Sequence, residues 1–339
     1  MTVSNSVHVI IAGNLASETI INLNGGVLVD QLGGNLAYTC AAYHLWCTGD
    51  GLISRVDEDY PQEYIEKFLP LGSDISGIHR TPQKLDLRAF YSIINEEKID
   101  SQDPVHFFSK LKMPLPKSLL GYSGLPYPEI DSRNKSSPLT FRPEDVPDSY
   151  LDASFAYLGD LDYLSLNFLP PHLRNRSVRH ILLKPSRGTL NPSFWYEFPT
   201  LVRGSTVVIC TQKSILNLFL GRTDNLWDIA QTIASCGVDH VIITCGAQGQ
   251  LLYNRVQKKR WQIPAYPVSV VDPIHASDAF AGGFLAGYRL HYDALMATIY
   301  GNVSASLKIQ GSGPFYPLGA LPDLVQSRLD LVRAKVIEC

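Results

Sequence analysis

An acidic residue near the start of a predicted helix is the strongest candidate for chemistry in this sequence. Asp278 lies in the run Val270–Gly287 (VVDPIHASDAFAGGFLAG), where a short apolar strand ends at Asp272 and a helix of small residues begins near Ala276. A helix start presents unpaired N–H groups and the positive end of the helix dipole, so it can hold a phosphate or a transferring phosphoryl group. A carboxylate there can accept the proton of an attacking hydroxyl. The alternative is that Asp278 only complements the helix dipole.

Glycines mark three further places where the backbone could approach a ligand or another element. In Val241–Tyr253 (VIITCGAQGQLLY) a strand runs into a Gly-x-x-Gly turn, which could approach a flat ligand such as adenine but is also common in β-hairpins. The pair Gly33–Gly34 precedes a predicted helix, where it could admit a sugar-sized ligand or form a tight turn without one. The pair Gly282–Gly283 is expected to permit close helix packing rather than to contact a ligand.

Alternating strands and helices are predicted to position these residues. Apolar runs predict strands at Val7–Ala12, Leu52–Val56, Leu85–Ile94, Ser154–Leu158, His180–Leu183, Thr206–Cys210 and His240–Thr244. Helical patterns between most of them predict right-handed βαβ units and a mostly parallel sheet covered on both faces, which is an α/β fold. Residues 101–150 interrupt this rhythm with eight of the 22 prolines. They predict a surface insertion near the mouth of the active site, functional or merely tolerated.

Composition limits the class of protein. The 339 residues suit one large domain, residues 1–339, and the net charge of −3 gives no electrostatic case for binding nucleic acid. The six cysteines form no C-x-x-C pair, and no Cys/His cluster has zinc spacing, so they are predicted to be reduced core residues. No leader-like N-terminus and no membrane-spanning run is recognisable, which predicts a soluble cytoplasmic protein without a membrane partner.

Taken together and in this order, these signals resemble the PfkB/ribokinase family of carbohydrate kinases. The resemblance runs over most of the chain and involves Ile10–Gly13, Gly33–Gly34, Ile53–Asp59 with Leu71–Ile78, Thr244–Tyr253, Asp272–Gly283 and Gly301–Pro314. It implies a ribokinase-like three-layer α/β sandwich with a small β-lid, built from about residues 17–33 and 79–94. It also implies a small-molecule substrate, ATP and Mg²⁺ as cofactors, K⁺ as a further candidate, and a homodimer formed through the lid.

The resemblance assigns a role to each candidate residue. Asp278 matches the base that deprotonates the substrate hydroxyl, and Asp272 matches an acid whose neighbourhood often binds a monovalent cation. The anion hole, whose backbone N–H groups stabilise the phosphoryl group, is implied to comprise His275, Ala276 and Ser277. The substrate site is implied to include Glu18, Gly33, Gly34, Asn35 and Tyr38, and the nucleotide site Thr244, Gly246 and Gly249.

Three departures from the family pattern make this a divergent member. The usual Gly-Ala-Gly-Asp is replaced by His275–Asp278, which adds side chains where a phosphate approaches; His275 could donate to a phosphate oxygen or block the site. The usual Asn-x-x-Glu is replaced by Thr211–Ser214, which has no carboxylate and should hold Mg²⁺ less firmly. Tyr38 stands where Asn is usual, which suits stacking on a nucleoside or sugar ring or simple packing.

Two hypotheses from different classes follow from the matches and the departures. The first is an ATP-dependent kinase of a sugar-like or nucleoside hydroxyl, which the presence of Asp278 favours. The second is a catalytically weakened relative that binds a small ligand or partner without turnover, which His275, Ser277 and the missing carboxylate favour. The first needs an open pocket at the helix start. A Rossmann-type dehydrogenase is poorly supported, because Gly13–Ser17 lacks the Gly-x-Gly-x-x-Gly fingerprint.

Overall fold

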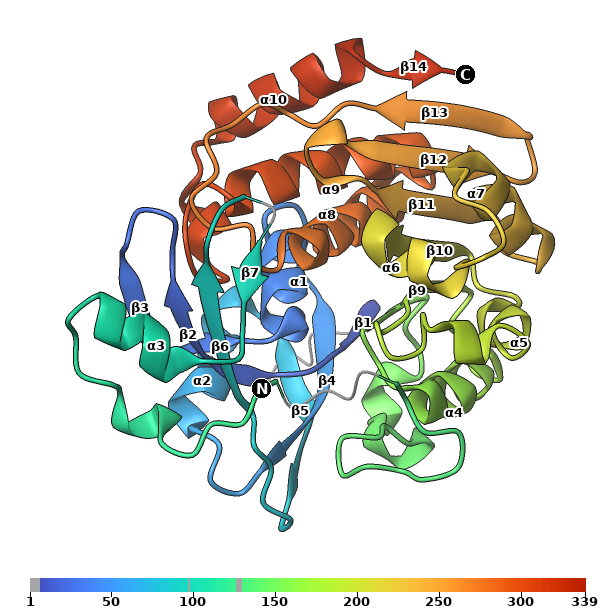
Figure 1. Ribbon diagram of the computed structural model, residues 1–339. Coiled ribbons are helices and arrows are strands. Elements are labelled where there is room, and N and C mark those ends of the chain that lie inside the picture. The colour runs from blue at the N-terminus through green and yellow to red at the C-terminus, as the bar shows by residue number, and fades with distance from the viewer. Residues whose placement is uncertain (1–6, 97, 126–129) are drawn as a thin grey trace.

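A large sheet and a small sheet organise the chain. The computed structural model describes residues 7–96, 98–125 and 130–339 (Figure 1). The large sheet has the strand order β14-β13-β12-β11-β10-β9-β8-β1-β4-β5. Its strands are β1 (Val9–Ala12), β4 (Asp50–Asp57), β5 (Asp74–Thr81), β8 (Phe155–Gly159), β9 (His180–Lys184), β10 (Val207–Thr211), β11 (His240–Thr244), β12 (Gln250–Asn254), β13 (Lys259–Ile263) and β14 (Ile337–Glu338). The pairs from β5 to β11 are parallel and those from β11 to β14 antiparallel, so the sheet is mostly parallel as predicted.

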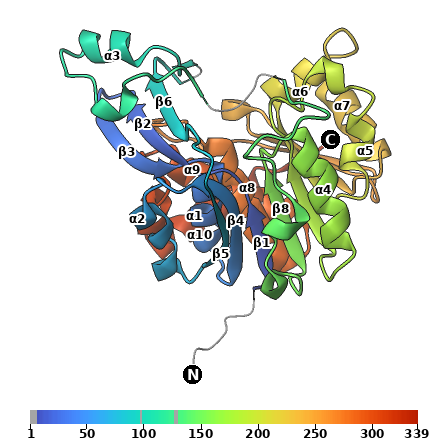
Figure 2. The ribbon, with the colours of Figure 1, turned by 90° about the horizontal axis from the view of Figure 1, so that it is seen from below.

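Helices cover both faces of the large sheet, and one short helix (residues 104–110) lies over the small sheet (Figure 2). They are α1 (Asn35–His44), α2 (Gln62–Glu66), α3 (Pro104–Lys110), α4 (Tyr163–Arg174), α5 (Phe198–Val202), α6 (Gln212–Leu218), α7 (Leu226–Ser235), α8 (Ala276–His291), α9 (Ala294–Lys308) and α10 (Pro322–Ala334). Strand β1 shows the layering: Val9 and Ile11 pack with α1, α8, α9 and α10, whereas Ile10 and Ala12 pack with α4 to α7. This alternation produces the three-layer sandwich, with an apolar core on each side of the sheet.

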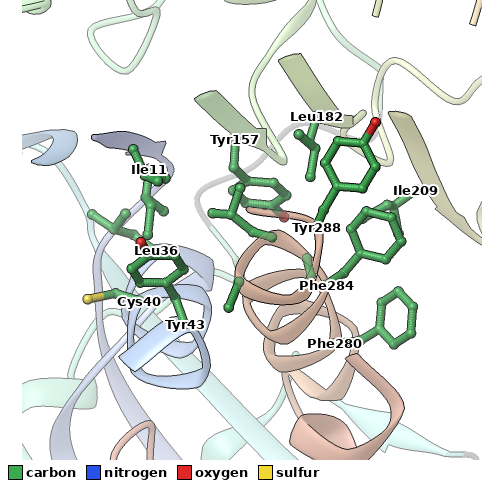
Figure 3. Close-up of a cluster of buried hydrophobic side chains, with 14 of the residues drawn as sticks. Ile11, Leu36, Cys40, Tyr43, Tyr157, Leu182, Ile209, Phe280, Phe284 and Tyr288 are labelled. Atoms are coloured by element: carbon green, nitrogen blue, oxygen red, sulfur yellow. The ribbon is translucent and has the colours of Figure 1, made fainter. Parts of the chain in front are cut away.

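Helix α8 carries the first candidate residue and lies in the centre of one core. Phe280, Phe284 and Tyr288 recur every fourth residue, so they form one helix face that points toward the sheet strands (Figure 3). The opposite faces of α8 lie against α1 and α9. A Cβ on Gly282 would come within 2.1 Å of the Thr39 carbonyl oxygen, and one on Gly283 within 2.2 Å of Ser304 Oγ. The predicted packing role of this glycine pair is therefore confirmed.

The small sheet lies over one end of the molecule and contains β2 (Ala16–Ile21), β3 (Val27–Gly33), β6 (Arg88–Ile93) and β7 (Ile99–Asp100), in the order β3-β2-β6-β7 (Figures 1 and 2). We call it the lid. Of the predicted lid segment 79–94, residues 79–81 belong to β5 of the large sheet and only residues 88–93 form a lid strand. The described part of residues 101–150 contains α3 and three short 3-10 turns (117–119, 143–145 and 148–150). None of the described helices has the length and apolar character needed to cross a membrane.

Candidate active site

The start of α8 has an unusual backbone, and His275 is the residue that produces it. Asp272 Oδ1 accepts the amide of Ile274 at 2.9 Å, which closes a tight turn after the preceding loop. His275 then adopts a left-handed conformation with φ of 58°, and the helix begins at Ala276. Non-glycine residues rarely adopt this conformation, so tertiary contacts of the side chain must hold it. Asp278 follows in the first turn and is 3% exposed.

The imidazole of His275 lies between the two carboxylates that the family resemblance placed around the substrate. Its Nδ1 lies 2.7 Å from Asp278 Oδ2 and its Nε2 lies 2.8 Å from Glu18 Oε1. Carboxylates only accept hydrogen bonds, so both ring nitrogens must carry a proton and the ring is an imidazolium. Burial lowers the pKa of His275, but the charge of Glu18 and the hydrogen bonds to both acids outweigh it and raise that pKa to about 10.

Lys184, at the carboxyl end of β9, occupies the other oxygen of Asp278. Its Nζ donates to Asp278 Oδ1 at 2.8 Å and also pairs with Asp160, which follows β8. Burial raises the pKa of Asp278, but Lys184 and His275 outweigh it and hold that pKa well below its ordinary value. Burial raises the pKa of Asp160 to about 6 despite the attraction of Lys184. Asp278 is therefore ionised and bound by two cations.

The lid residue Glu18 is held from three sides. Besides His275, its Oε1 accepts the amide of Gly34 at 2.7 Å and its Oε2 accepts the hydroxyl of Tyr38 at 3.0 Å. The Tyr38 ring also stacks on the imidazole, with centroids 4.3 Å apart and planes 18° apart. Gly33 is required here, because a Cβ on it would lie 2.0 Å from Glu18 Cδ. These predicted substrate residues lie together, and they contact one another.

Asn35, the remaining substrate candidate, connects three elements. Its Oδ1 accepts the amide of Asn14 at 2.7 Å, and its Nδ2 donates to the carbonyl of Gly159 at 2.7 Å. It is 4% exposed, so its side chain joins the start of α1 to the ends of β1 and β8. A buried amide with both ends bonded positions the backbone around a site more than it recognises a ligand.

One amide of the predicted anion hole, that of Ala276, is engaged within the protein. The Ala276 amide donates to the carbonyl of Pro273 at 3.2 Å and the Asp278 amide to that of His275 at 3.0 Å. The ring of His275 fills the space beside the helix start, between Asp278 and Glu18. A ligand can enter that space only after the ring moves.

Asp272, in whose neighbourhood the family resemblance implied a monovalent cation, is paired with a lysine. Lys308 Nζ lies 3.1 Å from Asp272 Oδ1 and donates to the Asp272 carbonyl at 2.9 Å. Both side chains are fully buried. Two buried opposite charges in contact neutralise each other, which removes the electrostatic need for K⁺.

The predicted nucleotide segment forms a turn between β11 and β12. Thr244 ends β11, and the Gly246 and Gly249 backbones have φ of 56° and 92°. A Cβ on Gly249 would lie 2.0 Å from the Ile263 carbonyl oxygen, so this glycine permits contact with β13. A Cβ on Gly246 would meet no atom within 4 Å, which leaves that side of the turn open to a flat ligand.

The segment that replaces Asn-x-x-Glu does not fit a Mg²⁺ site. Thr211 Oγ1 accepts the Ser214 amide at 3.2 Å as the N-cap of α6 and bonds the Ser214 hydroxyl at 2.9 Å. Residues 211–214 offer hydroxyl, amide and ammonium groups but no carboxylate. Mg²⁺ prefers carboxylate and phosphate oxygens, so we assign no step to a metal at this segment.

Three charged residues of the site were not identified from the sequence: Asp160, Lys184 and Lys308. Lys184 ends the buried parallel strand β9 and Asp160 follows the buried parallel strand β8, and the carboxyl ends of such strands are where ligands bind in α/β folds. A charged residue directly after the apolar run His180–Leu183 was therefore an available signal. Lys308 ends α9, 36 residues after Asp272, and no pattern in the sequence connects the two.

Comparisons with known proteins support the family and the fold. Residues 143–319, slightly more than half of the chain, match the model of the pfkB family carbohydrate kinases. A cytidine kinase of Thermococcus kodakarensis is 25% identical over 82% of this chain and 87% of its own length. A putative ribokinase II of E. coli, solved in complex with ATP and Mg²⁺, has a TM-score of 0.71 at 17% identity and covers 96% of this chain and 99% of its own. A Burkholderia thailandensis nucleoside kinase in complex with inosine has a TM-score of 0.66 at 17% identity, and the match covers 96% of this chain and 99% of the nucleoside kinase. The ribokinase-like fold is thereby confirmed.

Proposed function

The chain belongs to the pfkB family of carbohydrate kinases, and we propose that it transfers the γ-phosphoryl group of ATP to a hydroxyl of a sugar-like or nucleoside substrate, with Asp278 as general base. One observation carries this proposal. The carboxylate of Asp278 lies in the first turn of α8, beside the carboxyl ends of β8 and β9, and faces the lid residue Glu18 across the width of one imidazole ring.

Turnover requires His275 to leave the space between these acids. Its departure frees Asp278 Oδ2 to take the proton of a substrate hydroxyl and frees Glu18 Oε1 to accept a second hydroxyl. It also removes one of the two cations that lower the pKa of Asp278, so the carboxylate becomes a stronger base. Lys184 stays on Oδ1 and keeps the carboxylate oriented.

The acceptor that fits best is a ring with neighbouring hydroxyls. The same movement of His275 uncovers the face of Tyr38, on which a sugar ring can pack while its hydroxyls meet the two acids. A free sugar and the ribose of a nucleoside both meet this description. The cytidine kinase and the inosine-bound nucleoside kinase among the relatives favour the nucleoside.

A second candidate function is ligand binding without turnover. The imidazolium bridge between Glu18 and Asp278 favours it, because the charge pairs must break before a substrate hydroxyl can enter. The absence of a carboxylate from residues 211–214 also favours ligand binding without turnover. Under this hypothesis a small molecule would displace His275 but would not be phosphorylated.

The first experiment measures ADP formation from ATP with a panel of nucleosides and sugars. We expect turnover with at least one acceptor and a loss of about 100-fold or more in kcat for Asp278→Asn, since general base catalysis is worth that much. Asp228→Asn is the matched control, because Asp228 is an exposed acid in the first turn of α7 and should leave kcat unchanged. Full activity in Asp278→Asn would contradict the assigned role.

A second variant separates the two candidate functions. Glycine adopts positive φ without strain, so His275→Gly should keep the turn while removing the ring. If the protein is a kinase and His275 closes its site, we expect His275→Gly to have a lower KM for the acceptor than the wild type. If neither the wild type nor His275→Gly phosphorylates any acceptor, yet a nucleoside raises the melting temperature of both proteins, the binding function is the correct one.

A further inference from the structure

A second group of polar side chains lies buried away from the proposed active site, between α1, β4 and β5. Cys40 and His44 are one turn apart on α1, Asp50 begins β4, and Ser73 directly precedes β5. Cys40 and Asp50 are 0% and 1% exposed, and the side chain of His44 is 3% exposed. The proposed phosphoryl transfer uses none of these residues, so their burial in an otherwise apolar core needs another explanation.

The potential ligand atoms of this cluster converge on one point. The sulfur of Cys40, a ring nitrogen of His44 and a carboxylate oxygen of Asp50 all lie within 4.8 Å of one another. Cys40 Sγ lies 3.6 Å from Asp50 Oδ2, and His44 Nε2 lies 2.7 Å from Asp50 Oδ1. Ligands of a tetrahedral metal with bonds of about 2.0–2.3 Å lie roughly 3.3–3.7 Å apart. These two distances involve different oxygens of Asp50, so binding of a metal through one oxygen requires the carboxylate to rotate and the histidine to move outward by roughly half an ångström.

One oxygen of this cluster lacks a hydrogen bond. Ser73 Oγ donates to Asp50 Oδ2 at 2.8 Å and lies 2.9 Å from His44 Nε2. Asp50 Oδ1 accepts no hydrogen bond from the described residues, and its nearest polar neighbour is His44 Nε2 at 2.7 Å, with which it can form an ion pair if the ring is protonated. A fully buried carboxylate oxygen without a donor is costly and is usually satisfied by a cation or an ordered water.

We propose that Cys40, His44 and Asp50 bind one divalent transition-metal ion of the Zn²⁺ type. Thiolate, imidazole and carboxylate are the ligands that Zn²⁺ uses, and a hard cation such as Mg²⁺ or Ca²⁺ would not select sulfur and nitrogen. The ion replaces the thiol proton, which goes to solvent, so one thiolate and one carboxylate neutralise its two charges. Ser73 bonds the second oxygen of Asp50 and orients that carboxylate, and the Ser73 hydroxyl or a water completes the coordination.

A surface groove approaches the proposed site from the side of His44. The groove has a volume of about 340 Å³ and is lined also by Leu45, Trp46, Leu318, Ala320, Pro322, Val325 and Gln326. Burial and the charge of Asp50 raise the pKa of the Cys40 thiol well above its ordinary value, so without a metal this cysteine is an inert neutral thiol. The sequence spacing hid this group, because the third ligand comes from the next strand rather than from α1.

The test uses the full chain, stripped with a chelator and titrated with Co²⁺ as a spectroscopic substitute for Zn²⁺. We expect one equivalent to produce a thiolate-to-cobalt charge-transfer band, which Zn²⁺ abolishes, and Zn²⁺ to raise the melting temperature by several degrees. Cys40→Ser should lose the charge-transfer band, and Asp50→Asn should bind Co²⁺ at least 10-fold more weakly. Cys236→Ser, which removes a free cysteine at the end of α7, is the matched control and should keep both responses.

Each other outcome overturns the proposal. A charge-transfer band that survives in Cys40→Ser would assign the metal to another cysteine. No band in the wild-type chain, together with a melting temperature that Zn²⁺ does not change, would make the cluster a His44–Asp50 ion pair without a metal. Because Cys40→Ser is a small buried change, circular dichroism of that variant should first show the wild-type fold.

Discussion

At the scale of the residue, the site is a row of buried charges of alternating sign. Asp160, Lys184, Asp278, His275 and Glu18 contact one another in this order, from the end of the large sheet to the lid. Lys184 and His275 each pair with an acid at one end of the row, so removing either cation leaves that buried carboxylate without its ion-pair partner, which is more destabilising than the pair was stabilising. The row therefore holds the lid against the body and keeps the base oriented.

The row makes stability depend on pH through His275. Its pKa is about 10 in the folded chain and near 6.5 when unfolded, so its stabilisation is complete below pH 6.5 and is lost as the pH rises toward 10. We expect the unfolding free energy of the wild type to exceed that of His275→Asn most at pH 6.5. The excess should fall by up to about 1.4 kcal/mol per pH unit above that. Urea denaturation of both proteins from pH 6.5 to 10 measures the difference in their unfolding free energies. A difference that does not change with pH would show that His275 is neutral in the folded chain.

The buried pair of Lys308 and Asp272 predicts independence from monovalent cations. We expect the same melting temperature, and the same rate of any ATP turnover, in KCl and in tetramethylammonium chloride, because the ammonium group already neutralises Asp272. Lys308→Ala should be less stable by about 3–5 kcal/mol, since it leaves a buried carboxylate unpaired. This variant alone should be partly stabilised by K⁺. A wild-type protein that K⁺ activates would contradict the assignment.

The types of the site residues could be predicted from the sequence, but their contacts could not. Asp278, Glu18 and Tyr38 were identified from their places in the family pattern, and the structure brings all three together. The contact between His275 and Glu18 joins residues 257 positions apart, and it depends on the left-handed backbone of His275. Neither the rotamer of a side chain nor the balance between burial and charge that sets its pKa can be derived from spacing alone.

At the scale of the element, the close packing of α1 against α8 positions the site. The Thr39 hydroxyl donates to the Asp278 carbonyl at 3.3 Å, and the next residue toward the N-terminus, Tyr38, stacks on His275. Gly282 permits this approach one turn further along α8. The positions of these helices followed from the alternation of strands and helices, and the glycine pair indicated that two helices would approach closely. Which helix lay opposite each glycine could not be deduced.

This packing predicts that a single methyl group between the helices is damaging. In Gly282→Ala the new Cβ would lie 2.1 Å from a backbone oxygen, so the helices must separate. We expect the free energy of unfolding to fall by about 2 kcal/mol, because overpacking outweighs the better helix propensity of alanine. Gly319→Ala is the matched control, since a Cβ there meets no atom within 4 Å, and it should change stability by less than about 0.5 kcal/mol. Equal stability of the two variants in urea would contradict this account.

At the scale of the whole molecule, the insertion and the lid form one unit. Ile21 and Phe90 on the outer face of the lid pack with Phe108 of α3 and Leu119 of the insertion, and Figure 2 shows α3 over the lid strands. The inner face carries Glu18 and Ile20, with Ile20 packing on Ile274 just before α8. Proline content indicated an insertion in the sequence, but its lack of periodicity gave no conformation, so its place on the lid could not be predicted.

This covered face changes the expectation for the oligomeric state. A homodimer through the lid, which the family resemblance implied, cannot use the outer face while α3 lies on it, so we expect a monomer in sedimentation velocity. Phe108→Asp should displace α3, destabilise the chain by about 3 kcal/mol or more, and produce concentration-dependent association through the uncovered Ile21 and Phe90. Val105→Asp is the matched control, because Val105 lies on the same helix and is 57% exposed. A wild-type dimer that Phe108→Asp leaves intact would instead place the contact away from the outer face of the lid, for example at its edge strand β3.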